Sequence, residues 1–224
     1  MAKDARKTLS ESAYDALRDD IIRGRLEPEE KLRIEELRQK YATGASPLRE
    51  ALNRLAGEGF VTTEGQRGFR VAPLSRRNLR EITRLRIMLE CEAIRESIRN
   101  GDDEWEAGIV AASHRLAKTA VGDKVFPEWE LRNQDFHEAL IAACDSTLLL
   151  KYRRSLYEQH KRYRLISLLE HDLNRNVSEE HAAIMQAALN RREDLACEAT
   201  QQHIMRTAEI TEHAFSNLNV VGRD

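Results

Sequence analysis

The sequence predicts a mainly α-helical protein, with an N-terminal winged helix-turn-helix and a C-terminal antiparallel bundle of six to seven helices. Between residues 34 and 71, two short amphipathic segments flank a glycine-containing turn, and two β-prone runs follow. From Ser75 onward, apolar residues recur three and four apart in successive segments without a convincing strand pattern. A charged fraction of 33% with only 5% aromatic residues is typical of a soluble helical protein.

The second helix of the N-terminal pair is predicted within residues 46–60. Ser46 is a suitable N-cap residue, and Pro47 would then occupy the first helical position, where its missing N–H costs nothing. One face of this segment is apolar, which predicts a helix that packs inward and exposes its polar side. The residues of the apolar face are Leu48, Ala51, Leu52, Leu55 and Phe60.

The segments on either side complete the winged-helix pattern. Residues 34–42 predict the first helix of the pair, and residues 43–45 the turn. The β-prone runs around residues 65–68 predict a hairpin with a basic tip. A helical hairpin that only packs is the alternative interpretation of the helix pair taken alone.

Charge favours a nucleic-acid surface here. From Lys31 to Arg70 there are eight lysines or arginines against five acidic residues, whereas the whole chain has a net charge of −2. A local positive excess on an otherwise near-neutral protein is expected of a site-specific DNA-binding domain.

The chain of 224 residues is long enough for two domains. We expect a disordered leader at 1–10, a DNA-binding domain at 11–74 whose first helix spans 11–23, and a helical domain at 75–224. The linker is expected at 72–75, where a proline ends the strand and Ser75 can cap the next helix. The six helices of the second domain are predicted at 77–100, 103–120, 126–144, 147–169, 178–191 and 194–217.

The cellular compartment of the protein can be predicted from two kinds of segment that the sequence lacks. It contains no apolar run of about 18 residues and no apolar segment near its N-terminus, so neither a membrane span nor a secretory signal is expected. The three cysteines are odd in number and widely spaced, which indicates buried thiols in a reducing cytoplasm rather than disulfides or a zinc cluster.

Three histidines lie on the apolar faces of different predicted helices: His137, His181 and His203. Any one of them alone is better explained as a hydrogen-bonded core residue. Three buried imidazoles in one bundle each need a polar partner, and a single divalent cation would satisfy all three. Asn133 lies one helical turn before His137, so its side-chain oxygen is expected to face the same point.

The segment GASPLREALNRLAGEGFV, followed by QRGFRV, resembles the signature of the GntR family of bacterial winged-helix transcription regulators. The resemblance implies that the helix starting at Ser-Pro enters the major groove and that the wing contacts the minor groove or backbone. This chain departs from the family pattern at Ala45, where many members have an arginine that reads a base, and at Glu35, where some members have another arginine. Base readout would therefore depend more on Arg33, Arg49 and the wing. The implied DNA-binding residues are Arg33, Ser46, Arg49, Gln66, Arg67 and Gly68.

The second part resembles the FCD ligand-binding domain of the FadR-like branch of that family, through NQDFHEAL, EEHAAIMQAALNRRED and QQHIMR. LRDDIIRGRLEPEEKLR and GDDEWEA are most similar to the carbon-starvation-inducible branch. In FCD domains three histidines and usually an aspartate bind a metal, commonly Zn²⁺, with Ni²⁺, Mn²⁺ or another first-row ion possible. His137, His181 and His203 match the histidines, whereas Asn133 occupies the carboxylate position. The neutral amide implies weaker binding, or binding that an anionic ligand completes.

Arg86 and Glu90 match positions that line the effector pocket in this family, although an intrahelical ion pair one turn apart is the simpler interpretation. In the nearby run of Arg153, Arg154, Arg162 and Arg164, one or two arginines are expected to turn inward and bind a carboxylate.

The predicted function is therefore sequence-specific transcription regulation. A homodimer would bind a pseudo-palindromic double-stranded DNA operator, and a small organic acid at the metal-containing pocket would control its affinity. Repression relieved by ligand is the sense that the resemblance implies. A regulator that senses the cation itself is one alternative. A three-histidine metalloenzyme is another, although no HExxH or ExxH pairing occurs.

Overall fold

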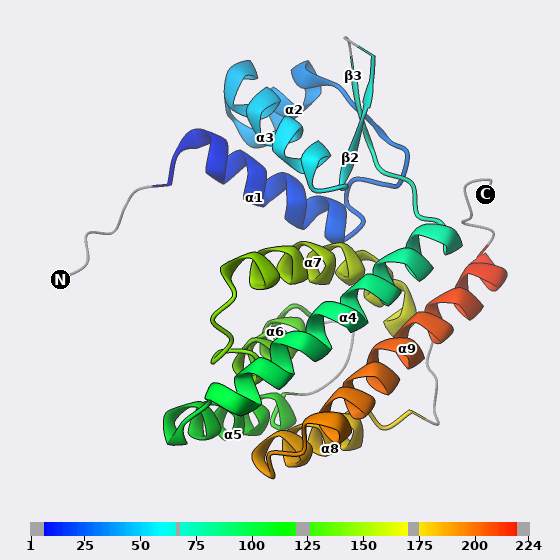
Figure 1. The fold of residues 1–224 in the computed structure, drawn as a ribbon. Coiled ribbons are helices and arrows are strands. Elements are labelled where there is room, and N and C mark those ends of the chain that lie inside the picture. The colour runs from blue at the N-terminus through cyan, green and yellow to red at the C-terminus, as the bar shows by residue number, and fades with distance from the viewer. Residues whose placement is uncertain (1–6, 66–67, 120–125, 170–174, 219–224) are drawn as a thin grey trace. The chain divides into compact units, whose positions relative to one another are not determined.

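The computed structural model describes residues 7–65, 68–119, 126–169 and 175–218 (Figure 1). The chain divides into two compact units. The first contains residues 1–79, 158–169 and 211–224, and the second contains residues 80–157 and 170–210. Three long helices therefore contribute to both units: α4 (Arg76–Asn100), α7 (Thr147–Leu169) and α9 (Glu193–Leu218).

The first unit contains the predicted winged helix-turn-helix. Its small sheet has the strand order β1-β3-β2, and both strand pairs are antiparallel. Leu32 of β1 is opposite Phe69 of β3, and Val61 of β2 is opposite Val71, so apolar side chains of all three strands face the helices. The elements are α1 (Leu9–Ile22), β1 (Lys31–Leu32), α2 (Ile34–Tyr41), α3 (Ala45–Gly57), β2 (Val61–Glu64) and β3 (Gly68–Val71).

Helix α1 begins at Leu9, two residues before the predicted start. The reason is a capping box. The Glu11 N–H donates to Thr8 Oγ1 at 3.1 Å, and the Thr8 N–H donates to Glu11 Oε2 at 2.8 Å. Two of the free N–H donors at the helix start are thereby satisfied, which stabilises the earlier start.

The start of α3 corrects the prediction for Ser46. Gly44 is the N-cap residue, without a side-chain hydrogen bond, so Ser46 and Pro47 are the second and third helical residues. Proline is tolerated there because the N–H groups of the first turn have no intrahelical acceptor. The left-handed residue of the preceding turn is Ala42, with φ 47°, rather than a glycine.

The predicted apolar face of α3 forms the centre of the first unit. Leu48, Leu52 and Leu55 are each 0% exposed, and Ala51 is 1% exposed. Leu17 of α1 is also 0% exposed and belongs to the same cluster. This burial confirms the predicted inward face of α3. Burying each of these leucines contributes about 1.5–3 kcal/mol to the stability of the fold.

After Ser75 the chain forms the six predicted helices, whose starts lie within one residue of the predicted ones. Ser75 caps the first of them, since its Oγ accepts from the Asn78 N–H at 3.1 Å. The observed bounds are α4 (Arg76–Asn100), α5 (Asp103–Ala117), α6 (Phe126–Leu140), α7 (Thr147–Leu169), α8 (Val177–Leu189) and α9 (Glu193–Leu218). Among the described residues, no helix is both long and apolar enough to cross a membrane.

Candidate functional site

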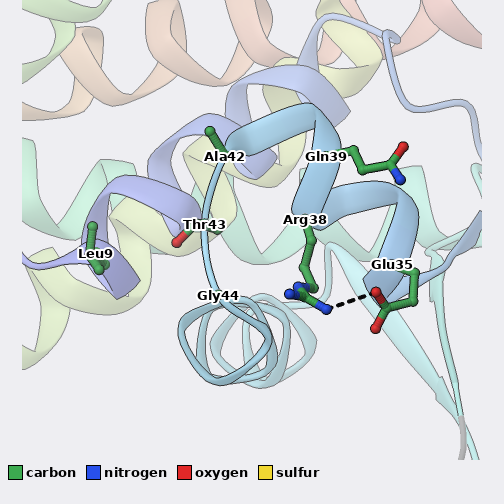
Figure 2. Close-up of a pocket in the computed structure, with 7 residues that line it drawn as sticks. All are labelled: Leu9, Glu35, Arg38, Gln39, Ala42, Thr43 and Gly44. Atoms are coloured by element: carbon green, nitrogen blue, oxygen red, sulfur yellow. Dashed lines mark hydrogen bonds and ion pairs between the residues drawn. The ribbon is translucent and has the colours of Figure 1, made fainter.

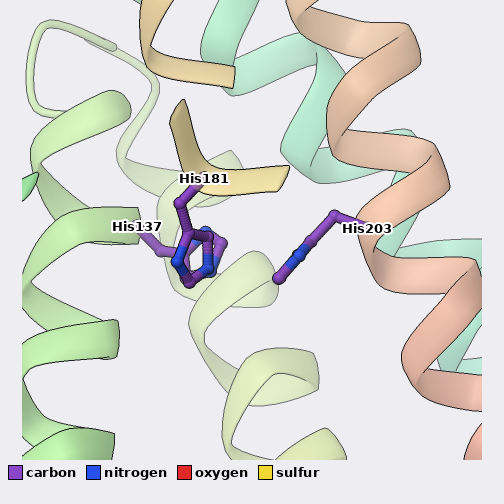
Figure 3. Close-up of side chains that lie close together, drawn as sticks. All are labelled: His137, His181 and His203. Atoms are coloured by element: carbon purple, nitrogen blue, oxygen red, sulfur yellow. The ribbon is translucent and has the colours of Figure 1, made fainter. Parts of the chain in front are cut away.

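Three histidine side chains converge in the second unit, as the sequence predicts (Figure 3). His137 comes from α6, His181 from α8 and His203 from α9. Their candidate ligand nitrogens all lie within 4.8 Å of one another. The residues are 2%, 4% and 5% exposed, respectively, so water is largely excluded from the cluster.

Burial favours the neutral form of His137 and His203. It holds the pKa of His137 well below its usual value, and the neighbouring histidines lower it further. Burial also lowers the pKa of His203 to about 4, although the Glu180 carboxylate partly opposes the shift. Neutral imidazole is the protonation state that a metal ion requires.

Asn133 is buried on α6, one helical turn before His137. It is 1% exposed, and its Nδ2 donates to the Tyr157 hydroxyl at 3.2 Å. Among the described residues, Asn133 Oδ1 and His137 Nε2 have no hydrogen-bond partner. Buried acceptors without partners are costly, and a divalent cation would satisfy both. The donor set of neutral nitrogens and one amide oxygen therefore fits a borderline first-row ion.

Glu180, which no sequence pattern singles out, contacts and orients His203. Glu180 Oε2 lies 2.7 Å from His203 Nδ1. Arg175 in turn binds both carboxylate oxygens, at 3.0 and 2.8 Å, and donates to the His203 backbone oxygen. A contact at Nδ1 leaves Nε2 of the same ring to bind a metal. The adjacent Glu179 and Glu180 look alike in the sequence, and only the backbone geometry distinguishes them.

Arg86 and Glu90 form the predicted ion pair, but the pair is buried rather than on the surface. Arg86 Nε lies 3.1 Å from Glu90 Oε1, and their side chains are 2% and 1% exposed. Arg153 Nε lies 3.0 Å from the other oxygen of Glu90, and Arg153 also pairs with Glu138 at 2.5 Å. Both guanidinium groups lie over the Tyr157 ring, at 4.6 and 4.7 Å from its centroid.

More arginines of the basic run turn inward than expected. Arg153, Arg162 and Arg164 are all buried, and only Arg154 is exposed. Arg162, in the first unit, donates to the Ala72 backbone oxygen at 2.6 Å. Helical spacing alone did not reveal these partners, because they come from distant segments of the chain.

The residues of α3 that are predicted to contact DNA are exposed on the surface. Ser46 and Arg49 are both exposed and lie three residues apart, so they share a helix face. Arg33 is the N-cap residue of α2 and forms an exposed pair with Glu36 at 2.7 Å. Gly68 is half-buried at the start of β3, whereas Gln66 and Arg67 lie outside the described residues.

Arg54 and Arg70, which were counted in the local excess, contact other residues of the first unit. The Arg54 guanidinium lies 3.8 Å from the centroid of the Tyr14 ring. Arg70 pairs with Glu64 at 2.7 Å and also donates to the Glu29 backbone oxygen. Both guanidinium groups are therefore held by other groups of the first unit.

An open hollow of about 490 Å³ lies beside the turn between α2 and α3 (Figure 2). Leu9 borders it from α1, and the Arg38–Glu35 pair, at 2.8 Å, borders it from α2. The lining residues are Leu9, Glu35, Arg38, Gln39, Ala42, Thr43 and Gly44. The hollow is shallow, so it is a surface feature rather than an enclosed ligand site.

Comparison with known proteins identifies both parts of the chain. Residues 9–71 match the family described as bacterial regulatory proteins, gntR family. Residues 81–206 match the FCD domain. The chain belongs to the GntR family.

Similar proteins include two transcription regulators of known sequence. This GntR-family chain is 41% identical over 203 residues to BphR of Paraburkholderia xenovorans (strain LB400), described as an uncharacterized HTH-type transcriptional regulator. The match covers 88% of this chain and 83% of BphR. The chain is also 38% identical to the HTH-type transcriptional repressor GlaR of Escherichia coli (strain K12), over 91% of this chain and 96% of GlaR.

The fold of this GntR-family chain is similar to that of Escherichia coli McbR/YncC. The TM-score is 0.78 at 20% identity, and the match covers 93% of this chain and 99% of the other. The relatives named here are transcription regulators, so the comparisons decide against the enzyme alternative. The protein is a DNA-binding transcription regulator of the GntR type with an FCD domain.

Proposed function

We propose that this regulator is a homodimeric repressor whose operator affinity is controlled by a small carboxylate metabolite. The metabolite would bind at a divalent metal held by His137, His181 and His203, with Asn133 as a fourth or weaker ligand. The observation that carries the proposal is the convergence of three buried imidazoles, whose ligand nitrogens lie within 4.8 Å, beside a buried arginine pair.

Charge explains why the ligand should be an anion. The three histidines and Asn133 are neutral ligands, so a bound divalent cation would keep its full charge. Nearby, Arg86 and Arg153 both form ion pairs with the buried Glu90. Arg153 also pairs with Glu138, whose side chain is 44% exposed. Excess positive charge in a buried site is costly, and a carboxylate that binds the metal would offset it.

The reading of DNA is proposed to rest on Ser46, Arg49, Arg33 and the wing that contains Gln66, Arg67 and Gly68. Two copies related by a two-fold axis would place two α3 helices in successive major grooves of a pseudo-palindromic operator. Repression is the sense proposed because GlaR, with 38% identity, is named a repressor.

Metal and ligand would act together on DNA affinity. A carboxylate changes operator affinity only by the difference in its binding energy between the DNA-bound and free conformations. In the alternative, the cation itself is the signal, and the three-histidine cluster would then respond to metal without any acid.

The test is operator binding measured by fluorescence anisotropy on the full chain, with metal removed by chelation or restored. A panel of mono- and dicarboxylates is added in each state. The proposal expects an acid to weaken operator binding only when metal is present. If metal alone shifts the affinity and no acid has an effect, the metal-sensing alternative replaces the proposal. If neither has any effect, control through this site is wrong.

A further inference from the structure

Cys91 of α4 and Cys197 of α9 lie against each other in the second unit. Cys91 Sγ lies 3.6 Å from the Cys197 backbone oxygen, and Cys197 Sγ lies 3.4 Å from the Cys91 backbone oxygen. Reciprocal contacts of this kind arise where two backbones approach closely, which is the condition that a disulfide requires. Both thiols are free, and the residues are 8% and 6% exposed.

The surroundings of this cysteine pair favour a thiolate at Cys197 rather than at Cys91, because the contact with Cys197 and burial both raise the pKa of the Cys91 thiol. Arg95, one turn after Cys91, carries a positive charge that acts on both sulfur atoms. Its side chain is 35% exposed and binds Asp194 at 3.4 Å, so the pair lies near the protein surface. A hydrogen bond from Cys91 lowers the pKa of the Cys197 thiol, and Arg95 lowers it further. Thiolates stabilised by a neighbouring cation are the ones that oxidise readily.

Cys144 provides an internal contrast. Burial, together with its hydrogen bond to Glu96, raises the pKa of this thiol to about 11. The Sγ donates to Glu96 Oε2 at 3.2 Å, so a negative charge rather than a positive one faces the sulfur atom. This thiol should therefore react slowly.

We propose that the cysteine pair is a reversible oxidation site that forms an intramolecular disulfide with hydrogen peroxide or an organic hydroperoxide. The Cys197 thiolate attacks one peroxide oxygen, so that an S–O bond forms, the O–O bond breaks, and the departing hydroxide or alkoxide takes up a proton. The Cys91 sulfur then attacks the resulting sulfenic acid. An S–S bond forms, the S–O bond breaks, and the hydroxide leaves as water with the Cys91 proton. Two thiols lose two electrons in total, and the peroxide is reduced.

The location connects this chemistry to the ligand-binding helices. Cys91 directly follows Glu90 on α4, and Cys197 precedes His203 by six residues on α9. A disulfide would join these two helices covalently, in keeping with the transient, redox-sensing disulfides of reducing compartments.

The experiment exposes the full chain to one equivalent of hydrogen peroxide and follows free thiols and intact mass. Two of the three thiols should be lost, the mass should fall by two hydrogen atoms, and dithiothreitol should reverse both changes. Peptide mapping should identify the link between Cys91 and Cys197. The variant Cys144→Ser is the control and should form the same disulfide.

The two single variants separate the steps. Cys91→Ser should stop at a sulfenic acid on Cys197, which a dimedone probe would trap, and Cys197→Ser should resist oxidation at equal peroxide. The proposal fails if Cys144 oxidises first, if Cys197→Ser loses thiols as fast as the wild type, if dimedone traps no sulfenic acid on Cys197 in Cys91→Ser, or if the disulfide joins two chains. These readouts do not involve metal or DNA, so they are independent of the proposed function.

Discussion

Glu180 Oε2 lies 2.7 Å from His203 Nδ1, and Arg175 holds the same carboxylate through two hydrogen bonds. Although burial alone would raise the pKa of Glu180, its contacts with His203 and Arg175 lower it to about 2. The carboxylate is therefore ionised when it accepts from the ring. Such a contact fixes the tautomer and the ring orientation of a metal-binding histidine.

Glu180→Gln should weaken metal binding about 10–100-fold, because the amide holds the ring less firmly. Metal affinity is measured by competition with a chromophoric chelator, and the melting temperature of the metal-free variant reports any general loss of stability. Glu179→Gln is the matched control, since Glu179 is the exposed neighbour in the same turn. If the two variants bind metal equally well, Glu180 does not orient the site.

Asn133→Asp should change metal and effector affinity in opposite directions. The carboxylate adds a negative charge to the donor set, and the Tyr157 hydroxyl, 3.2 Å from the present amide nitrogen, can donate to it. Metal binding should tighten by about tenfold or more, equivalent to 1.4 kcal/mol. Carboxylate ligands should bind more weakly, because less positive charge remains to be offset. Isothermal titration with metal, and then with acids, measures both, and weaker metal binding would count against Asn133 as a ligand.

Arg49→Ala should lose about 1–3 kcal/mol of binding to the operator, or roughly tenfold to more than a hundredfold in affinity, with little change on random duplex. Arg49 is exposed on the outer face of α3, so its removal should not unfold the domain. Arg23→Ala removes the same charge from the end of α1 and controls for general electrostatics. Anisotropy titrations at fixed salt compare the two variants. Full sequence-specific affinity in Arg49→Ala would contradict the assignment of α3 to the major groove.

Much of the fold is predictable from the sequence, because apolar spacing determines which helix faces are buried. The inward face of α3 and the convergence of His137, His181 and His203 both follow from that spacing. Boundaries are less predictable, since they depend on capping. The Thr8–Glu11 box starts α1 earlier than expected, and Gly44 rather than Ser46 caps α3.

The support around the site is harder to predict. Arg153 binds Glu90 and Glu138 across three helices, and Arg175 reaches Glu180 from the segment before α8. Local sequence does not specify such partners, because each interaction depends on how separate helices pack. A charged residue on a helix can equally be solvated or buried with a partner.

Gly101→Ala should destabilise the second unit by about 1–3 kcal/mol or more, as overpacking does. A Cβ at this position would collide with the Trp105 ring and lie 2.7 Å from the Ser97 backbone oxygen. Trp105 cannot move freely, because its Nε1 donates to the Leu140 oxygen at 3.3 Å and the Arg191 guanidinium lies over its ring.

Gly108→Ala is the counterpart within the same unit. A Cβ there would meet no atom within 4 Å, and the residue is exposed inside α5, so alanine should stabilise the helix by about 0.5–1 kcal/mol. Urea unfolding measures the free energy of unfolding of the Gly101→Ala and Gly108→Ala variants. Equal stability of the two variants would mean that the corner between α4 and α5 is looser than described.

Asp20 should make the winged-helix domain sensitive to acid. Its carboxylate accepts from Arg25 at 2.7 Å, from the Tyr41 hydroxyl at 2.6 Å and from Lys40 at 2.8 Å. Burial alone would raise the pKa of Asp20, but these hydrogen bonds outweigh it and hold the pKa below its usual value. The stabilisation is therefore complete above the unfolded-state pKa of about 3.9 and is lost as the pH falls through the lower folded-state value.

Asp20→Asn keeps the shape of the side chain but removes its charge, so at pH 7 it should cost about 1–3 kcal/mol, the value of hydrogen bonds to a charged group. Calorimetry of the full chain at a series of pH values compares the variant with the wild type. The difference in melting temperature should be constant at neutral pH and shrink below about pH 4, where the Asp20 carboxylate of the unfolded chain begins to take up a proton while that of the folded protein is still ionised. Asp19→Asn, at the exposed neighbouring carboxylate, should show a smaller difference throughout, since it lacks the contacts with Lys40 and Tyr41. A difference for Asp20→Asn that stayed constant down to pH 2 would show that shape, not charge, accounts for its contribution.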